Sequence, residues 1–196
     1  MKRIAIAAAV LGGAIVLSAC SSGVQPVTQQ VAPPTPASAS DLFALTDCGF
    51  SGAPAEVDAA DGVAISPDVS VLDAEVPSVY VRSGAAPARE LVSYELRPGT
   101  GDVAALDDLI SVEYCGVGLA SGALFDSSWV RGAPATFPLS QGSLIQGWVD
   151  GIPGMQVGER RVLIIPSDLA YGQNPPPGIA PGETLVFVVE LLGVGQ

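Results

Sequence analysis

The sequence lacks one side chain on which much nucleophilic and metal-assisted catalysis depends. It contains no histidine, which excludes Ser-His and Cys-His nucleophile pairs and any histidine-ligated metal site. Its cysteines, Cys20, Cys48 and Cys115, show no CxxC spacing, so a zinc site is not expected. The sequence therefore predicts neither a metal nor a cofactor.

One polar side chain follows a strongly apolar segment. Residues 162–165 form an apolar run rich in β-branched side chains, which predicts a strand buried on both faces. Pro166 cannot donate to a sheet and ends the strand, Asp168 begins a turn, and Tyr171 comes just before Gly172. A tyrosine at such a bend points its ring inward and its hydroxyl toward the mouth of a pocket. Taken alone, Tyr171 could also be a core tyrosine with a satisfied hydroxyl.

Three further motifs accompany this stretch in a fixed order. They are Phe125-Asp126-Ser127-Ser128, Leu144-Ile145-Gln146-Gly147-Trp148 and Thr184-Leu185-Val186-Phe187-Val188-Val189-Glu190-Leu191. Together with residues 157–172, they make the chain resemble the FKBP-type peptidyl-prolyl isomerases. The resemblance runs from about residue 91 to residue 194, more than half of the chain. It is specific because four separated motifs agree.

The resemblance implies an apolar cup that encloses the proline of an X-Pro segment, with Trp148 as its floor. Substrate carbonyls would be held by the backbone N–H of Ile145 and the hydroxyl of Tyr171. Asp126 would lie at the pocket edge, with Arg131 as its ion-pair partner. The cup positions are Tyr114, Phe125, Phe137, Leu144, Ile145, Trp148, Tyr171 and Phe187. The alternatives are that these aromatic residues are only core, and that Asp126 and Arg131 form a purely structural ion pair.

The implied reaction needs neither a nucleophile nor a metal. An X-Pro bond rotates over a barrier of about 18–20 kcal/mol because rotation breaks amide resonance. The twisted amide has less charge separation than the planar one, so transfer into an apolar cup favours the transition state over the ground state. The reaction therefore suits a chain without histidine.

Some positions depart from the family pattern. Ala135 stands where an aromatic residue often lines the pocket, Leu169 replaces a frequent tyrosine, and Pro176 stands where a histidine is common. These changes bear on peptide preference and macrolide affinity more than on basic activity.

The expected ligands are proline-containing segments of exported proteins, with macrolides such as tacrolimus or rapamycin as further candidates. Nucleic acid is not expected, because the formal net charge is −12.

The N-terminus has the pattern of an exported lipoprotein. A short basic start is followed by an apolar segment, residues 4–16, of about 20 Å as a helix at roughly 1.5 Å per residue. This is short for a bilayer core of roughly 30 Å and is typical of a signal peptide. The four residues Leu17 to Cys20 then resemble a bacterial lipobox, with cleavage before Cys20 and lipid on its sulfur. An ordinary signal peptide with an incidental cysteine is the alternative.

The chain divides into four parts on this interpretation. Residues 1–19 are the signal peptide, and residues 20–40 are the lipidated cysteine and a Pro-rich tether too poor in apolar side chains to fold. Residues 41–88 are an irregular arm that packs on the domain. The arm is acidic and carries no basic residue before residue 76. The simplest interpretation is that its charged side chains form a face exposed to solvent. Residues 89–196 are the isomerase domain, and the protein is expected at the membrane as a monomer.

The predicted fold is α+β, an antiparallel sheet curled around one short helix, as the resemblance also implies. In the arm, residues 69–72 could form a short strand. Apolar spacings of three and four predict the helix at residues 144–152. The expected strands are residues 91–96, 109–119, 123–125, 135–139, 160–165 and 184–192.

Two cysteines remain after lipidation of Cys20, in an oxidising compartment. If Tyr114 faces the cup, Cys115 must face the opposite side of the sheet, because successive side chains alternate. An arm wrapped over that outer face would bring Cys48 above it. We therefore expect a disulfide between Cys48 and Cys115.

Taken together, the sequence predicts an exported, membrane-tethered prolyl isomerase that assists protein folding. A non-catalytic binding module for proline-containing segments is one alternative. A structural lipoprotein of the envelope, in which the acidic arm matters most, is another.

Overall fold

The structure is a computed structural model that describes residues 43–57 and 62–195. The predicted signal peptide, Cys20 and the tether therefore lie outside the described residues. Within the described part of the chain, no helix is long and apolar enough to cross a membrane.

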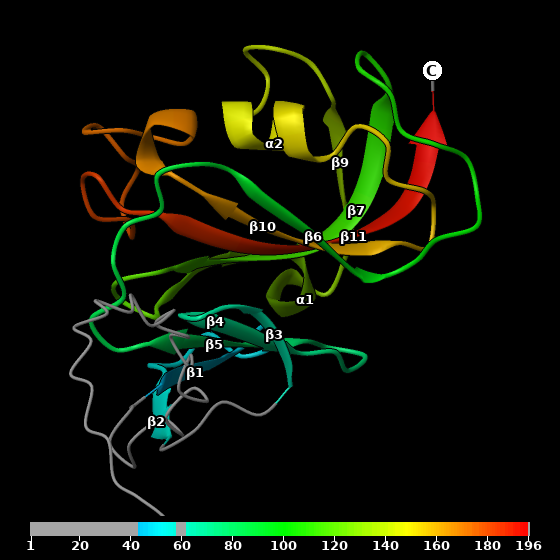
Figure 1. The fold of residues 1–196 in the computed structure, drawn as a ribbon. Coiled ribbons are helices and arrows are strands. Elements are labelled where there is room, and N and C mark those ends of the chain that lie inside the picture. Colours follow the sequence, from blue (N-terminus) through cyan, green and yellow to red (C-terminus); the bar gives the residue numbers. More distant parts are fainter. Residues whose placement is uncertain (1–42, 58–61, 196) are drawn as a thin grey trace, which may run out of the picture. The chain divides into compact units, whose positions relative to one another are not determined.

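A six-stranded antiparallel sheet forms the larger part of the described chain (Figure 1). Its strand order is β6-β10-β11-β7-β8, and β9 pairs with the first half of β7. The strands are β6 (Val92–Arg97), β7 (Leu109–Gly118), β8 (Leu124–Ser127), β9 (Ala135–Pro138), β10 (Arg160–Ile165) and β11 (Leu185–Gly195). The predicted antiparallel sheet is confirmed.

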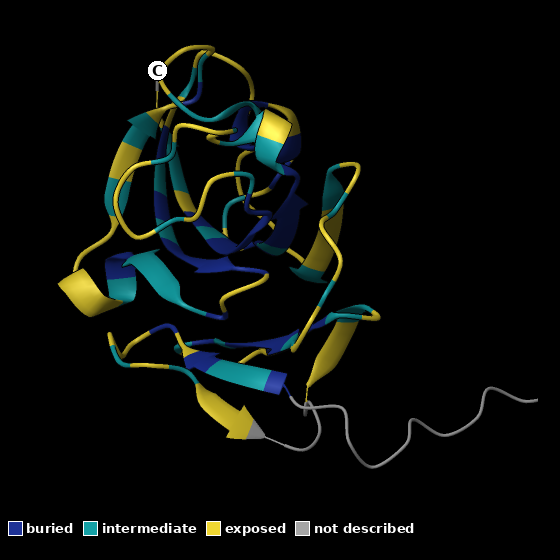
Figure 2. Cartoon of the chain, turned by 90° about the vertical axis from the view of Figure 1, so that its left-hand side faces the viewer, coloured by how far each residue is buried: buried dark blue, intermediate teal, exposed yellow. Residues whose placement is uncertain are grey.

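This sheet is buried on both faces because alternate side chains enter two separate cores. Leu163 and Ile165 of β10 belong to the core beneath the helix, whereas Val162 and Ile164 belong to the core on the outer face. Figure 2 shows the central strands as a buried layer. The prediction for residues 162–165 is thus confirmed, and the double burial explains why this segment has no polar face.

Two short α-helices accompany the sheet, whereas the sequence predicted one. The predicted helix is α2 (Gln146–Gly151), which packs on β10. Gly147 permits this packing, because a Cβ there would lie 2.4 Å from Cγ2 of Ile165. The helix that the prediction missed is α1 (Ser128–Arg131), a single turn capped by Ser127 and ended by Gly132 in a left-handed conformation. One turn is too short to show a helical apolar period.

The arm is not irregular, so that part of the prediction is wrong. It forms a five-stranded antiparallel sheet in the order β2-β1-β5-β4-β3. Its strands are β1 (Phe43–Asp47), β2 (Ala55–Val57), β3 (Val63–Ser66), β4 (Val69–Leu72) and β5 (Ser78–Arg82). Each has only three to five residues, and acidic residues lie between them, which hides the alternation. The short strand expected at residues 69–72 is confirmed as β4.

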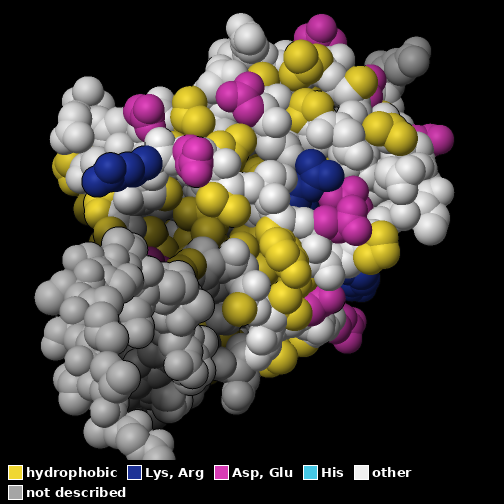
Figure 3. All heavy atoms as spheres, in the orientation of Figure 1, with side chains coloured by type: hydrophobic (Ala, Val, Ile, Leu, Met, Phe, Trp, Pro, Cys, Tyr) yellow, Lys and Arg dark blue, Asp and Glu magenta, His cyan; other side chains and the backbone are white. Residues whose placement is uncertain are grey.

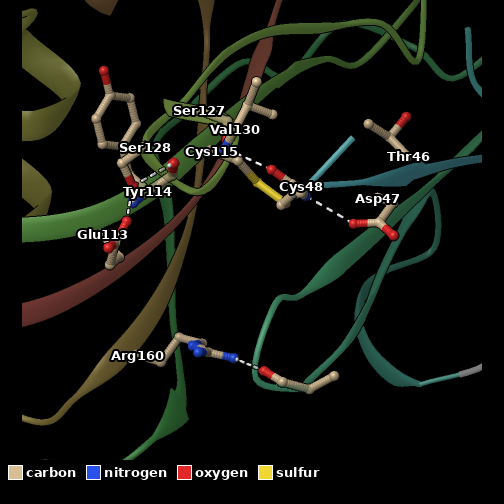
Figure 4. Close-up of a disulfide and its surroundings, with 12 residues drawn as sticks. Thr46, Asp47, Cys48, Glu113, Tyr114, Cys115, Ser127, Ser128, Val130 and Arg160 are labelled. Atoms are coloured by element: carbon tan, nitrogen blue, oxygen red, sulfur yellow. Dashed lines mark hydrogen bonds between the residues drawn. A yellow bond between two sulfur atoms is a disulfide. The ribbon is translucent and has the colours of Figure 1, made fainter. Parts of the chain in front are cut away.

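The arm covers the outer face of the larger sheet. Val69, Val71, Val79 and Val81 of the arm share one buried cluster with outer-face residues of β7, β10 and β11. A disulfide joins Cys48, which directly follows β1, to Cys115 of β7 (Figure 4). Tyr114 belongs to the opposite core, as the alternation argument requires. The predicted disulfide is confirmed.

A buried arginine forms a second connection between the arm and the isomerase domain. Arg160 of β10 is 1% exposed and pairs with Asp73 of the arm and with Glu190 of β11. It also donates to backbone carbonyls at Ala74 and Glu75. Its charge is therefore compensated on several sides, as a buried guanidinium requires.

On the surface visible in Figure 3, acidic side chains are interspersed with apolar ones.

Candidate functional site

A cavity of about 500 Å³ opens on the α2 side of the larger sheet. Its walls come from β7, β8, β9 and β11, from the loop before α2, from α2 itself, and from the segment after the 3₁₀ turn Ser167–Leu169. The lining residues are Tyr114, Phe125, Asp126, Phe137, Gly142, Ser143, Leu144, Ile145, Gln146, Trp148, Ala170, Tyr171 and Phe187. Every residue assigned to the cup from the sequence lies on this one cavity.

The floor of the cavity is a cluster of aromatic rings around Trp148, which is 3% exposed. The Trp148 ring lies edge-to-face with Tyr114 and Phe187 at 5.3 Å and with Phe137 at 5.7 Å between ring centroids. Edge-to-face contacts are favourable because the positive edge of one ring meets the negative face of another. Among the described residues, none accepts a hydrogen bond from the buried Trp148 indole N–H. The floor is therefore apolar except for one unused donor.

Gly116 creates room for the aromatic wall. A Cβ at this position of β7 would lie 2.3 Å from Cζ of Phe125 and 2.8 Å from Cε1 of Phe187. The two phenyl rings lie edge-to-face with 5.5 Å between their centroids. The absent side chain thus lets Phe125 and Phe187 lie directly against the sheet, and this close approach shapes one side of the cavity.

A polar cluster of three mutually bonded side chains, called the rim below, consists of Tyr114 and Asp126 of the cavity lining and of Arg131 beside them. The Tyr114 hydroxyl donates to Oδ2 of Asp126, and Arg131 Nη1 donates to Oδ1 of the same carboxylate. Arg131 Nη2 donates to the Tyr114 hydroxyl at 3.0 Å, and the guanidinium lies over the Tyr114 ring, 5.2 Å from its centroid. Burial, and then the hydrogen bond to Asp126, raise the pKa of Tyr114 to about 12. The expected Asp126–Arg131 ion pair is present, and Tyr114 joins it.

Tyr171 lies at the mouth of the cavity with 38% of its surface exposed. Burial raises the pKa of its phenol, and the negative charge of Asp126 raises it further. No hydrogen bond links the Tyr171 hydroxyl to another described residue. Tyr171 is therefore not a core tyrosine with a satisfied hydroxyl, and it stays protonated and able to donate at neutral pH.

The loop before α2 supplies lining residues that sequence reasoning missed. Gly142 and Ser143 precede the predicted Leu144 and Ile145, and Gln146 begins α2 and donates to Asp150 at 2.7 Å. Ala170, next to Tyr171, was missed as well. Their small or polar side chains give no apolar signal. Their position beside recognised motifs could have identified them.

The family departures lie outside the cavity lining. Ala135 and Leu169 pack against the core on the cavity side, and Pro176 lies in the loop between β10 and β11. No group of three or more Cys, Asp or Glu side chains within residues 43–57 and 62–195 is placed to hold a metal ion.

Comparison with known proteins identifies a family whose model covers the residues that line the cavity. A family model described as FKBP-type peptidyl-prolyl cis-trans isomerase matches residues 101–192, which include every lining residue. The FK506-binding protein of Streptomyces anulatus is 47% identical over 122 residues, covering 61% of this chain and 98% of that protein. FkpA from Escherichia coli is 40% identical with a TM-score of 0.50, over 54% of this chain and 48% of that one. AtFKBP13 is 34% identical with a TM-score of 0.50, over 55% of this chain and 94% of that one.

Proposed function

The chain belongs to the FKBP-type peptidyl-prolyl cis-trans isomerases, and we propose that it catalyses X-Pro rotation by enclosing the proline in the cavity described above. The observation that carries this mechanism is the aromatic floor around Trp148, with Asp126 and Tyr171 at the edge of the same cavity. A concave apolar site with a few convergent polar groups is the usual form of a small-ligand pocket. The family binds proline-containing substrates and FK506-type ligands.

The proposed mechanism relies on differential solvation. The planar amide has the larger charge separation, so it loses more than the twisted amide when both leave water for an aromatic cavity. The proline ring rests on Trp148. The substrate carbonyls accept hydrogen bonds from the backbone N–H of Ile145 and from the Tyr171 hydroxyl. Asp126 lies at the edge, and its contacts with Tyr114 and Arg131 fix its orientation.

The cellular role is a further part of the proposal. The protein is exported, anchored to the cell membrane by lipid on Cys20, monomeric, and assists the folding of exported proteins. The lipobox-like Leu17 to Cys20 segment supports export and anchoring, and a disulfide between Cys48 and Cys115 suits an oxidising compartment. Two acyl chains suffice for stable anchoring, whereas one is marginal. A Cys20→Ser protein that is processed and stays on the membrane like the parent would refute the anchor.

Graded loss of activity in three variants tests the mechanism, because no side chain in it forms a covalent bond. Tyr171→Phe should lose little kcat/KM, since one hydrogen bond disappears. Asp126→Ala should lose more, because Arg131 is left without its carboxylate. Phe187→Ala should lose most, and part of that loss would reflect core destabilisation of about 3–5 kcal/mol. The assay is therefore run at a temperature where circular dichroism shows each variant to be folded. Complete loss in Tyr171→Phe alone would contradict the solvation mechanism.

A further inference from the structure

One buried hydroxyl connects three elements directly behind the rim of the cavity. Ser127 is the last residue of β8 and is 4% exposed. Its Oγ donates to the carbonyl oxygen of Cys48 in the arm at 2.6 Å and accepts from the N–H of Val130 at 3.3 Å. The second contact makes Ser127 the N-cap of α1. Arm, β8 and α1 therefore meet at one oxygen atom (Figure 4).

Cys48 is a fixed acceptor, because it is held from two other sides. Its sulfur is bonded to Cys115, the residue directly opposite Ser127 in the β7–β8 ladder. Its N–H donates to the carbonyl oxygen of Pro77 at 3.0 Å. Residues directly opposite in an antiparallel pair point to the same face, so Cys115 and Ser127 both face the arm. The disulfide thus holds the Cys48 carbonyl against the Ser127 hydroxyl.

The segment around Ser127 carries both charged members of the rim. Asp126 precedes Ser127, and Arg131 lies in the single helical turn that Ser127 caps. An isolated helical turn is unstable by itself, so the position of α1 depends on its contacts. One is this cap, and another is Ser128, whose Oγ accepts from the Tyr114 N–H at 2.8 Å. A displaced Ser127 would move Asp126 and Arg131 together.

We propose that Ser127 and Cys48 are positioning residues for the isomerase site. The arm, through the Cys48 carbonyl, fixes the Ser127 hydroxyl and thereby the Asp126–Arg131 pair at the rim. This inference rests on the proposed role of Asp126 at the pocket edge. It gives the arm an effect on catalytic efficiency in addition to its effect on stability.

The chain offers a matched control for the test. Thr46 is 3% exposed, and its Oγ1 donates to the carbonyl oxygen of Gly122. This is also a buried hydroxyl bond from arm to domain, but it contacts neither Asp126 nor α1. The experiment compares Ser127→Ala, Ser127→Thr and Thr46→Val in the full chain. Two quantities are measured: kcat/KM on a Leu-Pro peptide, and the NMR signal of the Arg131 side-chain Nε–H without substrate.

Ser127→Ala should shift the Arg131 signal and lower kcat/KM about 2- to 10-fold, the range that corresponds to a lost hydrogen bond of about 0.5–1.5 kcal/mol. Ser127→Thr should restore both toward the wild type, and Thr46→Val should change neither. An unchanged Arg131 signal in Ser127→Ala, or an equal shift in Thr46→Val, would overturn the inference. If Ser127→Ala does not fold, the Cys48→Ala, Cys115→Ala double variant must shift the Arg131 signal, and an unchanged signal there overturns it. An inactive wild type would instead count against the proposed function, so the two failures are distinguishable.

Discussion

Replacing Tyr114 by phenylalanine isolates the hydroxyl at the rim. The variant loses the bond donated to Asp126 and the bond accepted from Arg131 at 3.0 Å. It keeps the ring beneath the guanidinium and the contact with Trp148 at 5.3 Å. Hydrogen bonds to charged groups contribute about 1.5–3 kcal/mol, but the Asp126–Arg131 pair survives and is half exposed. We therefore expect the free energy of unfolding to fall by about 1–2 kcal/mol at neutral pH.

The same variant tests the raised pKa of Tyr114, which is about 12. At pH 11, about one tenth of this phenol should be ionised in the folded protein, against about nine tenths for an ordinary tyrosine. The fold favours the neutral phenol, so the stability gained from it is complete below pH 10 and is lost as the pH rises toward 12. The advantage of the wild type over Tyr114→Phe should shrink by about 1 kcal/mol between pH 10 and pH 11.

Ultraviolet titration of tyrosinate and denaturant unfolding at pH 8, 10 and 11 measure both effects. Subtracting the Tyr114→Phe titration from that of the wild type cancels the other tyrosines. The difference should show one phenol that is still mostly protonated at pH 11. A difference curve with its midpoint near pH 10, or a stability difference that does not depend on pH, would refute the reasoning about the rim.

The remaining predictions concern the cavity wall and the disulfide. Gly116→Ala should displace the Phe125 and Phe187 rings, lower stability by about 1–3 kcal/mol through overpacking, and reduce kcat/KM; unaltered thermal unfolding and activity would contradict the close approach seen here. Reducing the disulfide between Cys48 and Cys115, whose sequence separation is 67, should lower the free energy of unfolding by up to about 4 kcal/mol in the chain-entropy model. Identical denaturant midpoints with and without reductant would show that packing alone holds the arm.

Much of the isomerase domain could be predicted because its signals are long or local. The apolar run at residues 162–165 has no polar face, so it predicts a strand that is buried on both sides. Four aromatic residues of the cup lie in strands, namely Tyr114, Phe125, Phe137 and Phe187, whereas Trp148 lies in α2 and Tyr171 follows the 3₁₀ turn. The orientation of Cys115, on the face opposite to Tyr114, could be predicted because successive side chains of a strand alternate between its two faces.

The arm and the rim show where sequence reasoning was insufficient. The strands of the arm are each too short to establish a period, and the buried valines of β4 and β5 pack against the outer face of β7, β10 and β11. That burial depends on contacts between segments far apart in the chain. The bond from Tyr114 to Asp126 has the same origin, because it joins two neighbouring strands, β7 and β8. Helix α1 is a single turn whose signal was only its caps, Ser127 and Gly132.

We expect this protein to accelerate X-Pro rotation in an apolar cavity without covalent or metal chemistry. NMR exchange spectroscopy on a Leu-Pro peptide, with purified full chain and with or without a chelator, tests it most directly. We expect the cis/trans exchange rate to rise in proportion to protein concentration and to be the same with chelator present. A folded protein that leaves the exchange rate unchanged, or one that loses its activity on chelation, would contradict the account.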